Sequence, residues 1–138
     1  MSAFEPQAIG WSATMGLIPG YGHANDAVTL VLRRKRLLDA WNEAMDACQN
    51  ETRFSISCVM TEATVLYPES GGCPVGGEKA IALNGSSNPK YVKPHEFEAF
   101  MDAVETVVKQ VQERMEQTSC RIEFTPIMRS TYSRTDGK

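Results

Sequence analysis

Two loops of this 138-residue chain carry the residue types that bind small anions. The first runs from Gly16 to Asp26 and the second from Asn84 to Pro94, and each precedes a stretch with helical spacing. Free backbone amides and the helix dipole at such a position both favour negative charge. We therefore expect the two loops to emerge in related positions and to form a site for a small anionic ligand, such as a nucleotide or another phosphate-bearing molecule.

Side chains in and near these loops can complete such a site. Tyrosine can stack on a ligand, and Arg33 and Arg36, which share one helical face, can bind phosphate or carboxylate with two nitrogens each. The predicted ligand-binding residues are Tyr21, His23, Arg33, Arg36, Asn84, Ser86, Asn88, Tyr91 and Arg129. Neither loop matches a phosphate-binding or dinucleotide fingerprint, so ordinary turns with helix caps are the alternative.

Proton transfer is the second chemistry that the residue types permit. Glu62 is the carboxylate with strand-like sequence on both sides, and His95 lies at the start of a predicted helix. Either group can act as a general acid or base if a substrate lies within reach. They are the catalytic candidates, but nothing in the sequence shows that they converge, so we expect a non-catalytic protein rather than an enzyme.

The cysteines indicate neither a metal site nor a nucleophile. The four are widely spaced, with no CxxC pair, and only two histidines could join them. Cys73 lies in the Gly-rich stretch Gly71–Gly77, and the nearby carboxylates Glu69 and Glu78 disfavour its thiolate. We therefore predict no metal and no cofactor. We interpret Gly71–Gly77 as a hairpin tip that either folds over a ligand or contacts a partner, or is a plain connection between two strands.

Composition and charge exclude several classes of protein. The net charge of −3 argues against a general nucleic-acid binder, although residues 33–36 form a local basic cluster. The longest apolar run, residues 27–32, is too short to span a bilayer, and the N-terminus lacks the pattern of a secretory signal. A soluble, cytoplasmic protein with no membrane partner is expected.

The elements that must position these residues follow a repeated plan of strand, loop, helix and strand, over residues 9–60 and again over 78–128. Val31, Leu38 and Trp41 are expected to lie on the apolar face of the first helix, although β-branched residues leave a strand over 27–33 as an alternative. The expected elements are strands at 9–18, 53–67, 78–83 and 120–128 and helices at 27–49 and 95–117.

The resulting order, β-α-β-β-α-β, resembles the ferredoxin-like arrangement in fold alone. That resemblance implies a two-layer α+β sandwich, in which two helices cover one face of an antiparallel sheet, and it implies no activity. We expect a flexible arm at 1–8, one domain at 9–129 and a disordered tail at 130–138. The uncovered sheet face and the long hairpin predict a homo-oligomer.

Three functions remain open at this level. The favoured hypothesis is a non-catalytic oligomeric module that binds a nucleotide-like or phosphate-like ligand between subunits. A cofactor-independent enzyme that uses Glu62 or His95 for proton transfer is the first alternative, and a structural or protein-interaction subunit is the second.

Overall fold

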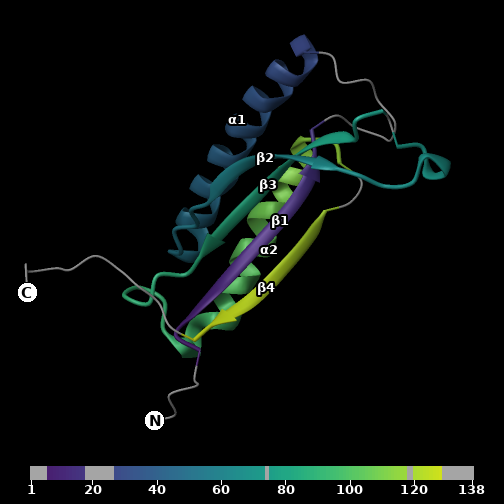
Figure 1. The fold of residues 1–138 in the computed structure, drawn as a ribbon. Coiled ribbons are helices and arrows are strands. Elements are labelled where there is room, and N and C mark those ends of the chain that lie inside the picture. Colours follow the sequence, from purple (N-terminus) through teal and green to yellow (C-terminus); the bar gives the residue numbers. More distant parts are fainter. Residues whose placement is uncertain (1–5, 18–26, 74, 118–119, 129–138) are drawn as a thin grey trace, which may run out of the picture.

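One four-stranded sheet and two long helices make up the fold (Figure 1). The computed structural model describes residues 6–17, 27–73, 75–117 and 120–128. The elements are β1 (Ala8–Gly16), α1 (Ala27–Thr52), β2 (Val59–Val65), the 3₁₀ turn η1 (Glu69–Gly71), β3 (Glu78–Ser86), the 3₁₀ turn η2 (Pro94–Glu96), α2 (Phe97–Arg114) and β4 (Arg121–Ile127).

The strands are ordered β2-β3-β1-β4, and every neighbouring pair is antiparallel. β3 therefore lies between β1 and β2, and β1 lies between β3 and β4, so each strand–helix–strand unit is split by a strand of the other unit. Both helices lie behind the sheet in Figure 1. The predicted two-layer ferredoxin-like sandwich is confirmed, as is the hairpin between β2 and β3.

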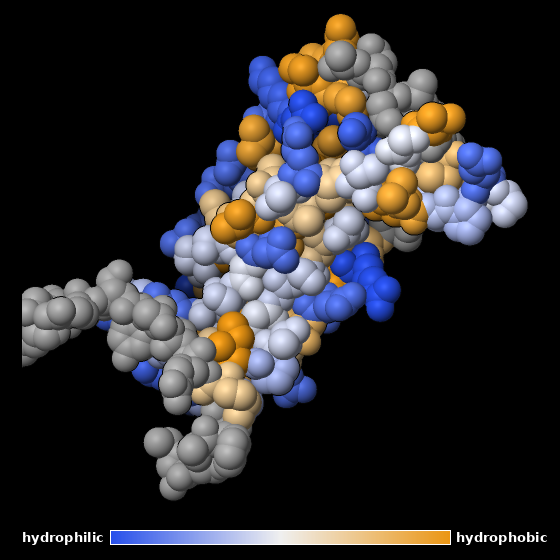
Figure 2. Space-filling model, viewed as in Figure 1, coloured by the Kyte–Doolittle hydropathy of each residue, from blue (hydrophilic) through white to orange (hydrophobic). Residues whose placement is uncertain are grey.

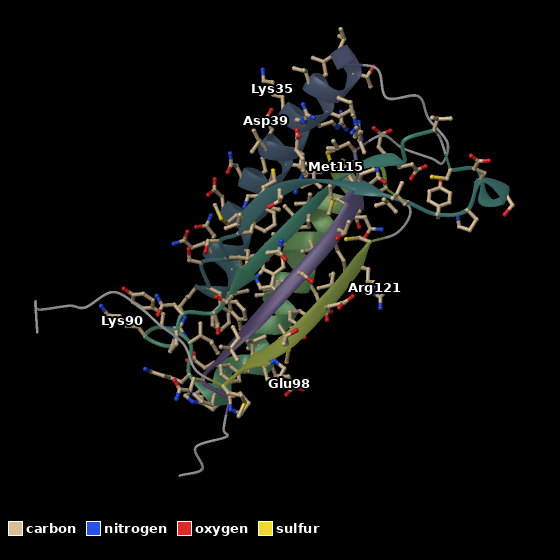
Figure 3. The ribbon with its side chains drawn as sticks, viewed as in Figure 1. Lys35, Asp39, Lys90, Glu98, Met115 and Arg121 are labelled. Carbon is tan, nitrogen blue, oxygen red and sulfur yellow. The ribbon has the colours of Figure 1, made fainter. Side chains whose placement is uncertain are left out.

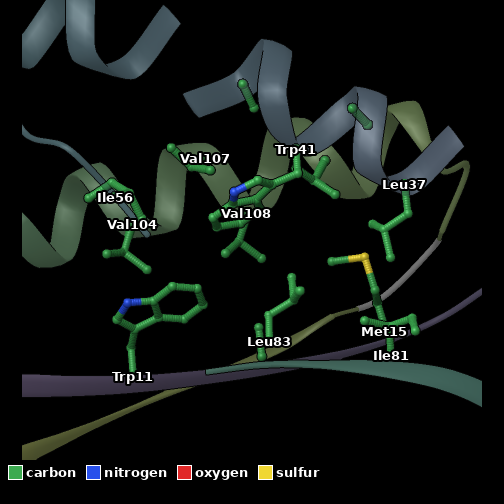
Figure 4. Packing of buried hydrophobic residues seen from close by; sticks show 14 of the residues in the cluster. Trp11, Met15, Leu37, Trp41, Ile56, Ile81, Leu83, Val104, Val107 and Val108 are labelled. Atoms are coloured by element: carbon green, nitrogen blue, oxygen red, sulfur yellow. The ribbon is translucent and has the colours of Figure 1, made fainter. Parts of the chain in front are cut away.

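Alternation along the strands directs apolar side chains to the helix layer. In the register of β1 and β3, Ala13 pairs with Leu83 and Met15 pairs with Ile81, and all four are buried. Trp11 continues this face of β1 and stacks on Trp41 of α1, with ring centroids 6.0 Å apart (Figure 4). Burial of this face against two helices supplies most of the apolar surface that leaves water on folding.

α2 seals the core from behind with closely spaced valines. Val104, Val107, Val108 and Val111 are fully buried, at the three- and four-residue spacing of a single helical face. Figure 4 shows three of them beside Trp11 and Trp41. The expected second helix is thus confirmed, with slightly shorter bounds.

α1 differs from expectation in the face it buries. The segment from Ala27 is helical, so the alternative of a strand over 27–33 is wrong. Val31 and Leu38 are 61% and 51% exposed, whereas their neighbours Leu30 and Leu37 are buried with Trp41. The helix is therefore rotated by about one residue relative to the expected apolar face, and it leaves apolar side chains in solvent near its N-terminal end.

Two expected boundaries are wrong for a physical reason. Residues 53–58 are not in a strand, because Phe54 turns inward to meet Phe100 edge to face at 5.9 Å and Ile56 is buried. Asn84 and Ser86, expected in a loop, belong to β3, where they pair with Ser12 and Gly10. The expected arm at 1–8 overlaps β1, which begins at Ala8, while residues 1–5 and the tail at 130–138 lie outside the described residues.

The sheet face away from the helices carries small or polar side chains over its centre, with Val59 on β2 and with Arg121 and Glu123 on β4. By register this face presents Ser12, Thr14, Thr61, Ala82 and Asn84. Figure 2 shows a pale surface over the sheet, with apolar side chains gathered at the end where α1 begins and the hairpin projects. Exposed apolar residues in that region include Val28, Val31, Leu32, Leu66 and Val75.

We predict that Gly85→Ala destabilises the fold by about 1–3 kcal/mol, because a side chain there overpacks the core. A Cβ at Gly85 would lie 2.5 Å from the Ser57 carbonyl oxygen and 2.7 Å from Nε1 of Trp11. Urea unfolding measures the loss. Gly71→Ala is the control, because a Cβ there lies 3.5 Å from its nearest neighbour. Equal stability of the two variants would contradict the packing argument.

Candidate functional site

The antiparallel register places the two predicted binding loops at opposite ends of the sheet. Gly16, at the end of β1, pairs with Ala80, near the start of β3, whereas Ser86 at the end of β3 pairs with Gly10. Figure 3 shows the same separation, with Met115 at the hairpin end and Lys90 and Glu98 at the other. The strand ends from which the two loops leave therefore lie at opposite ends of the sheet, while residues 18–26 of the first loop lie outside the described residues.

Arg33 and Arg36 contact protein carbonyl groups. Arg33 Nε donates to the Leu17 carbonyl oxygen at 2.6 Å, and one of its terminal nitrogens donates to the carbonyl of Met115. Arg36 Nε donates to the Arg114 carbonyl at 2.9 Å. The last carbonyls of a helix lack intrahelical partners and carry partial negative charge, so these guanidinium groups cap the C-terminus of α2.

A small polar pocket surrounds Glu62 on β2, which is an edge strand of the sheet. Its carboxylate pairs with Arg34 of α1, at 2.5 Å between Oε1 and a terminal guanidinium nitrogen. The pocket has a volume of about 290 Å³, and Thr64 and Lys79 also line it. Arg34 Nε is buried and has no hydrogen-bond partner among the described residues. The pocket therefore presents one carboxylate and two cations, which suits a ligand that carries both signs of charge.

A larger cavity lies at the other end of the sheet, between the α1–β2 and β3–α2 connections. Its volume is about 460 Å³, and it is lined by the predicted residues Ser86, Asn88 and Tyr91. Asn88 Oδ1 accepts a hydrogen bond from the backbone N–H of Lys90, so it also holds the local turn. The structure therefore brings three of the predicted ligand-binding residues together, away from Arg33 and Arg36.

The remaining candidates are dispersed. Asn84 is exposed on the open sheet face, and His95 is exposed in η2 and lines neither pocket. Tyr21, His23 and Arg129 lie outside the described residues. Glu62 and His95 are thus not neighbours in one pocket, and of the two only Glu62 has charged groups arranged around it.

Three of the four cysteines, Cys48, Cys58 and Cys120, pack in or against the hydrophobic core. Burial raises the pKa of Cys58 to about 11 and also raises the pKa of Cys120, so both remain protonated near neutral pH. Among the residues that the structure describes, no group of three His, Cys, Asp or Glu side chains could hold a metal ion. Within the same residues, no helix is long and apolar enough to cross a membrane.

Comparison with known proteins decides the family. The family model described as SAM lyase matches residues 11–132, which is most of the chain. The chain belongs to the SAM lyase family. SAM denotes S-adenosylmethionine.

Solved structures of SAM lyases share the fold. A phage SAM lyase in the apo state has a TM-score of 0.55 and 14% identity, over 100% of this chain and 94% of that one. A phage SAM lyase in complex with S-methyl-5'-thioadenosine has a TM-score of 0.55 and 16% identity, over 98% of this chain and 95% of that one. At such identity these likenesses show the fold alone. No curated protein matches the chain.

Membership of the SAM lyase family corrects two expectations. The favoured hypothesis of a non-catalytic binding module is wrong, and so is the expectation that the chain is not an enzyme. The sequence contains no motif of a familiar catalytic chemistry, and the prediction of a non-catalytic protein rested on that absence. A pocket with mixed charge at a sheet edge leaves no local sequence motif.

Sequence reasoning selected Ser86 but did not select Arg34, Lys79 or the other serines of the larger cavity, Ser55, Ser57 and Ser87. Arg34 was part of the basic cluster, but Arg33 and Arg36 were preferred for their shared face. Helical geometry offers one signal for Arg34: Arg33 and Arg34 lie three and four residues after the buried Leu30 and are both half-buried, whereas Arg36 is exposed. The partner of Arg34 on β2 becomes visible only when the strand is placed.

We predict that Arg33→Gln lowers the free energy of unfolding by about 1.5–3 kcal/mol, because it removes charged hydrogen bonds to two carbonyls in a largely buried setting. The matched change Arg36→Gln is expected to cost less than about 1 kcal/mol, since its side chain is 53% exposed and its contacts are screened. Urea unfolding compares the two. Equal losses would contradict the assignment of Arg33 as the principal cap.

Proposed function

We propose that this protein cleaves S-adenosylmethionine into S-methyl-5'-thioadenosine and a product of the aminobutyrate part, without consuming water. The match of the SAM lyase family model over residues 11–132 carries the proposal. The phage SAM lyase in complex with S-methyl-5'-thioadenosine supports the nucleoside part of the predicted ligand. A phosphate-bearing ligand is not required, because S-adenosylmethionine has no phosphate.

We propose the following bond changes for this substrate and product. The bond between the sulfonium sulfur and Cγ breaks, and its electron pair stays on sulfur as the neutral thioether. The substrate's own carboxylate oxygen forms the new bond to Cγ and closes a five-membered lactone. Atoms and charge balance with no other reactant. The protein's task is to fold the aminobutyrate chain so that the carboxylate lies behind Cγ, and positioning of this kind can supply several kcal/mol.

The pocket around Glu62 supports this reaction. The Glu62 carboxylate attracts the sulfonium and ammonium groups, while Lys79 and Arg34 favour the carboxylate end of the same substrate. Glu62 is 66% exposed at the uncovered edge of the sheet, so the pocket opens to solvent in a single chain. Attack of the carboxylate on Cγ removes the negative charge of the carboxylate and the positive charge of the sulfonium, and exclusion of water favours such a step.

A second copy of the chain would supply that exclusion, and we include a homo-oligomer in the proposal. Exposed apolar side chains lie along β2 and the hairpin, including Val59 at 68% on the open sheet face and Leu66 at 75% just after the end of β2. An unpaired edge strand with apolar neighbours is a surface that association covers. The sequence predicted association through the open sheet face or the hairpin, and we propose the hairpin together with the neighbouring edge of β2.

We predict that Glu62→Gln lowers the rate of S-methyl-5'-thioadenosine formation by about 100-fold or more, because a charge that positions the substrate is lost. Chromatography of the nucleoside product and mass analysis of the aminobutyrate product measure both halves of the reaction. Glu98→Gln, an exposed carboxylate at the far end of the molecule, is the control (Figure 3). Full activity of Glu62→Gln would remove Glu62 from the site, and an inactive wild-type protein would overturn the proposed reaction.

We also predict that the protein sediments as at least a dimer and that Leu66→Glu shifts it toward the monomer with a matching loss of cleavage rate. A charge introduced into an apolar contact opposes association, while an exposed position spares the fold. Leu38→Glu, on the outer side of α1, is the matched control. Sedimentation velocity reports the assembly, and a monomeric, fully active wild-type protein would contradict the prediction.

A further inference from the structure

The larger cavity, at the end of the sheet opposite Glu62, has the properties of a ligand site that the proposed reaction does not use. Its volume of about 460 Å³ lies within the range of small-molecule pockets. It is formed where residues 52–57, after α1, meet residues 86–92, after β3. The first segment supplies Phe54, Ser55 and Ser57, and the second supplies Ser87, Asn88 and Tyr91.

Several hydroxyl groups in this cavity donate no hydrogen bond to the described part of the chain. Ser87 is only 3% exposed, and its Oγ accepts a hydrogen bond from the Ile9 N–H at 2.9 Å. Its own hydroxyl proton has no acceptor among the described residues, and buried donors of this kind are rare. The side chains of Ser55, Ser57 and Ser86 likewise make no hydrogen bond with that part of the protein.

Aromatic rings form the apolar part of the wall. Phe54 and Phe100 meet edge to face, and Tyr91 is 68% exposed at the rim, with Lys90 Nζ 5.5 Å from its ring centroid. A ring held in this way offers a face on which a planar group can stack. Hydroxyl donors and acceptors beside aromatic faces suit a ligand with a sugar at one end and a flat base at the other.

Charge in the cavity is balanced. Arg53 and Glu96 are the charged lining residues, and Glu96 Oε1 already accepts a hydrogen bond from the Lys93 N–H at the start of α2. The anion-binding potential of this helix start is therefore met by the protein's own carboxylate. The remaining polar groups are neutral, which favours an uncharged ligand over a phosphate.

We propose that this cavity is a second ligand site, which binds a neutral nucleoside with its ribose hydroxyls on the serines and its base against the aromatic wall. The site is separate from the pocket around Glu62 and does not depend on the reaction proposed there. Adenosine is the probe, because it carries both groups and has no reactive sulfonium.

The test is a titration of the ¹⁵N-labelled full chain with adenosine, followed by backbone amide shifts. Saturable shifts at Ser55, Ser57 and Ser87 are expected, and they persist in Glu62→Gln, which separates this site from the proposed reaction. Tyr91→Ala is expected to raise the dissociation constant by about ten-fold, in line with the loss of one stacking face. Shifts confined to residues around Glu62 and Lys79, or no shift at all, would overturn the proposal.

Matched variants and related ligands test which groups of the cavity bind the nucleoside. Ser55→Ala is expected to weaken binding while Ser70→Ala, an exposed serine on η1, leaves it unchanged, and both sites tolerate the change without unfolding because they are exposed. Equal effects of the two would count against the site. Adenosine 5'-monophosphate that binds more tightly than adenosine would overturn the neutral-ligand assignment, and ribose that binds as tightly would overturn the role of the aromatic wall.

Discussion

The antiparallel pairing of β1 with β3 is the constraint on which the placement of both pockets depends. Each strand–helix–strand unit must return its second strand parallel to its first, and the strand of the other unit that lies between them runs the opposite way. The start of α2 and the hairpin therefore lie at opposite ends. One end receives charged groups around Glu62, and the other receives hydroxyl and aromatic groups.

The same constraint explains why α1 carries so many arginines near its N-terminal half. The C-terminus of α2 lies at the hairpin end, where its last carbonyls need partners, and α1 passes beside it. Arg33 links that terminus to the end of β1 through the Leu17 carbonyl, so one side chain joins the two layers. Arg34, one residue further round the helix, is thereby directed to the sheet edge and to Glu62.

Much of the fold could be predicted from sequence, because it depends on local periodicity. The three- and four-residue spacing of valines in α2 and the alternation in β1 both identify a buried face without tertiary information. The face of α1 could not be predicted in the same way, since Leu30, Val31, Leu37 and Leu38 form adjacent apolar pairs. Only packing against α2 and the sheet decides which member of each pair is buried.

The candidate site was harder to predict because it depends on contacts distant in sequence. Glu62 could be selected as a strand carboxylate, but its partner Arg34 is 28 residues earlier and Lys79 is on a neighbouring strand. In the proposed reaction, a resting pair of Glu62 and Arg34 keeps both charges compensated before substrate arrives. A zwitterionic substrate can exchange partners with that pair without leaving a net charge, which limits the cost of removing water from the pocket.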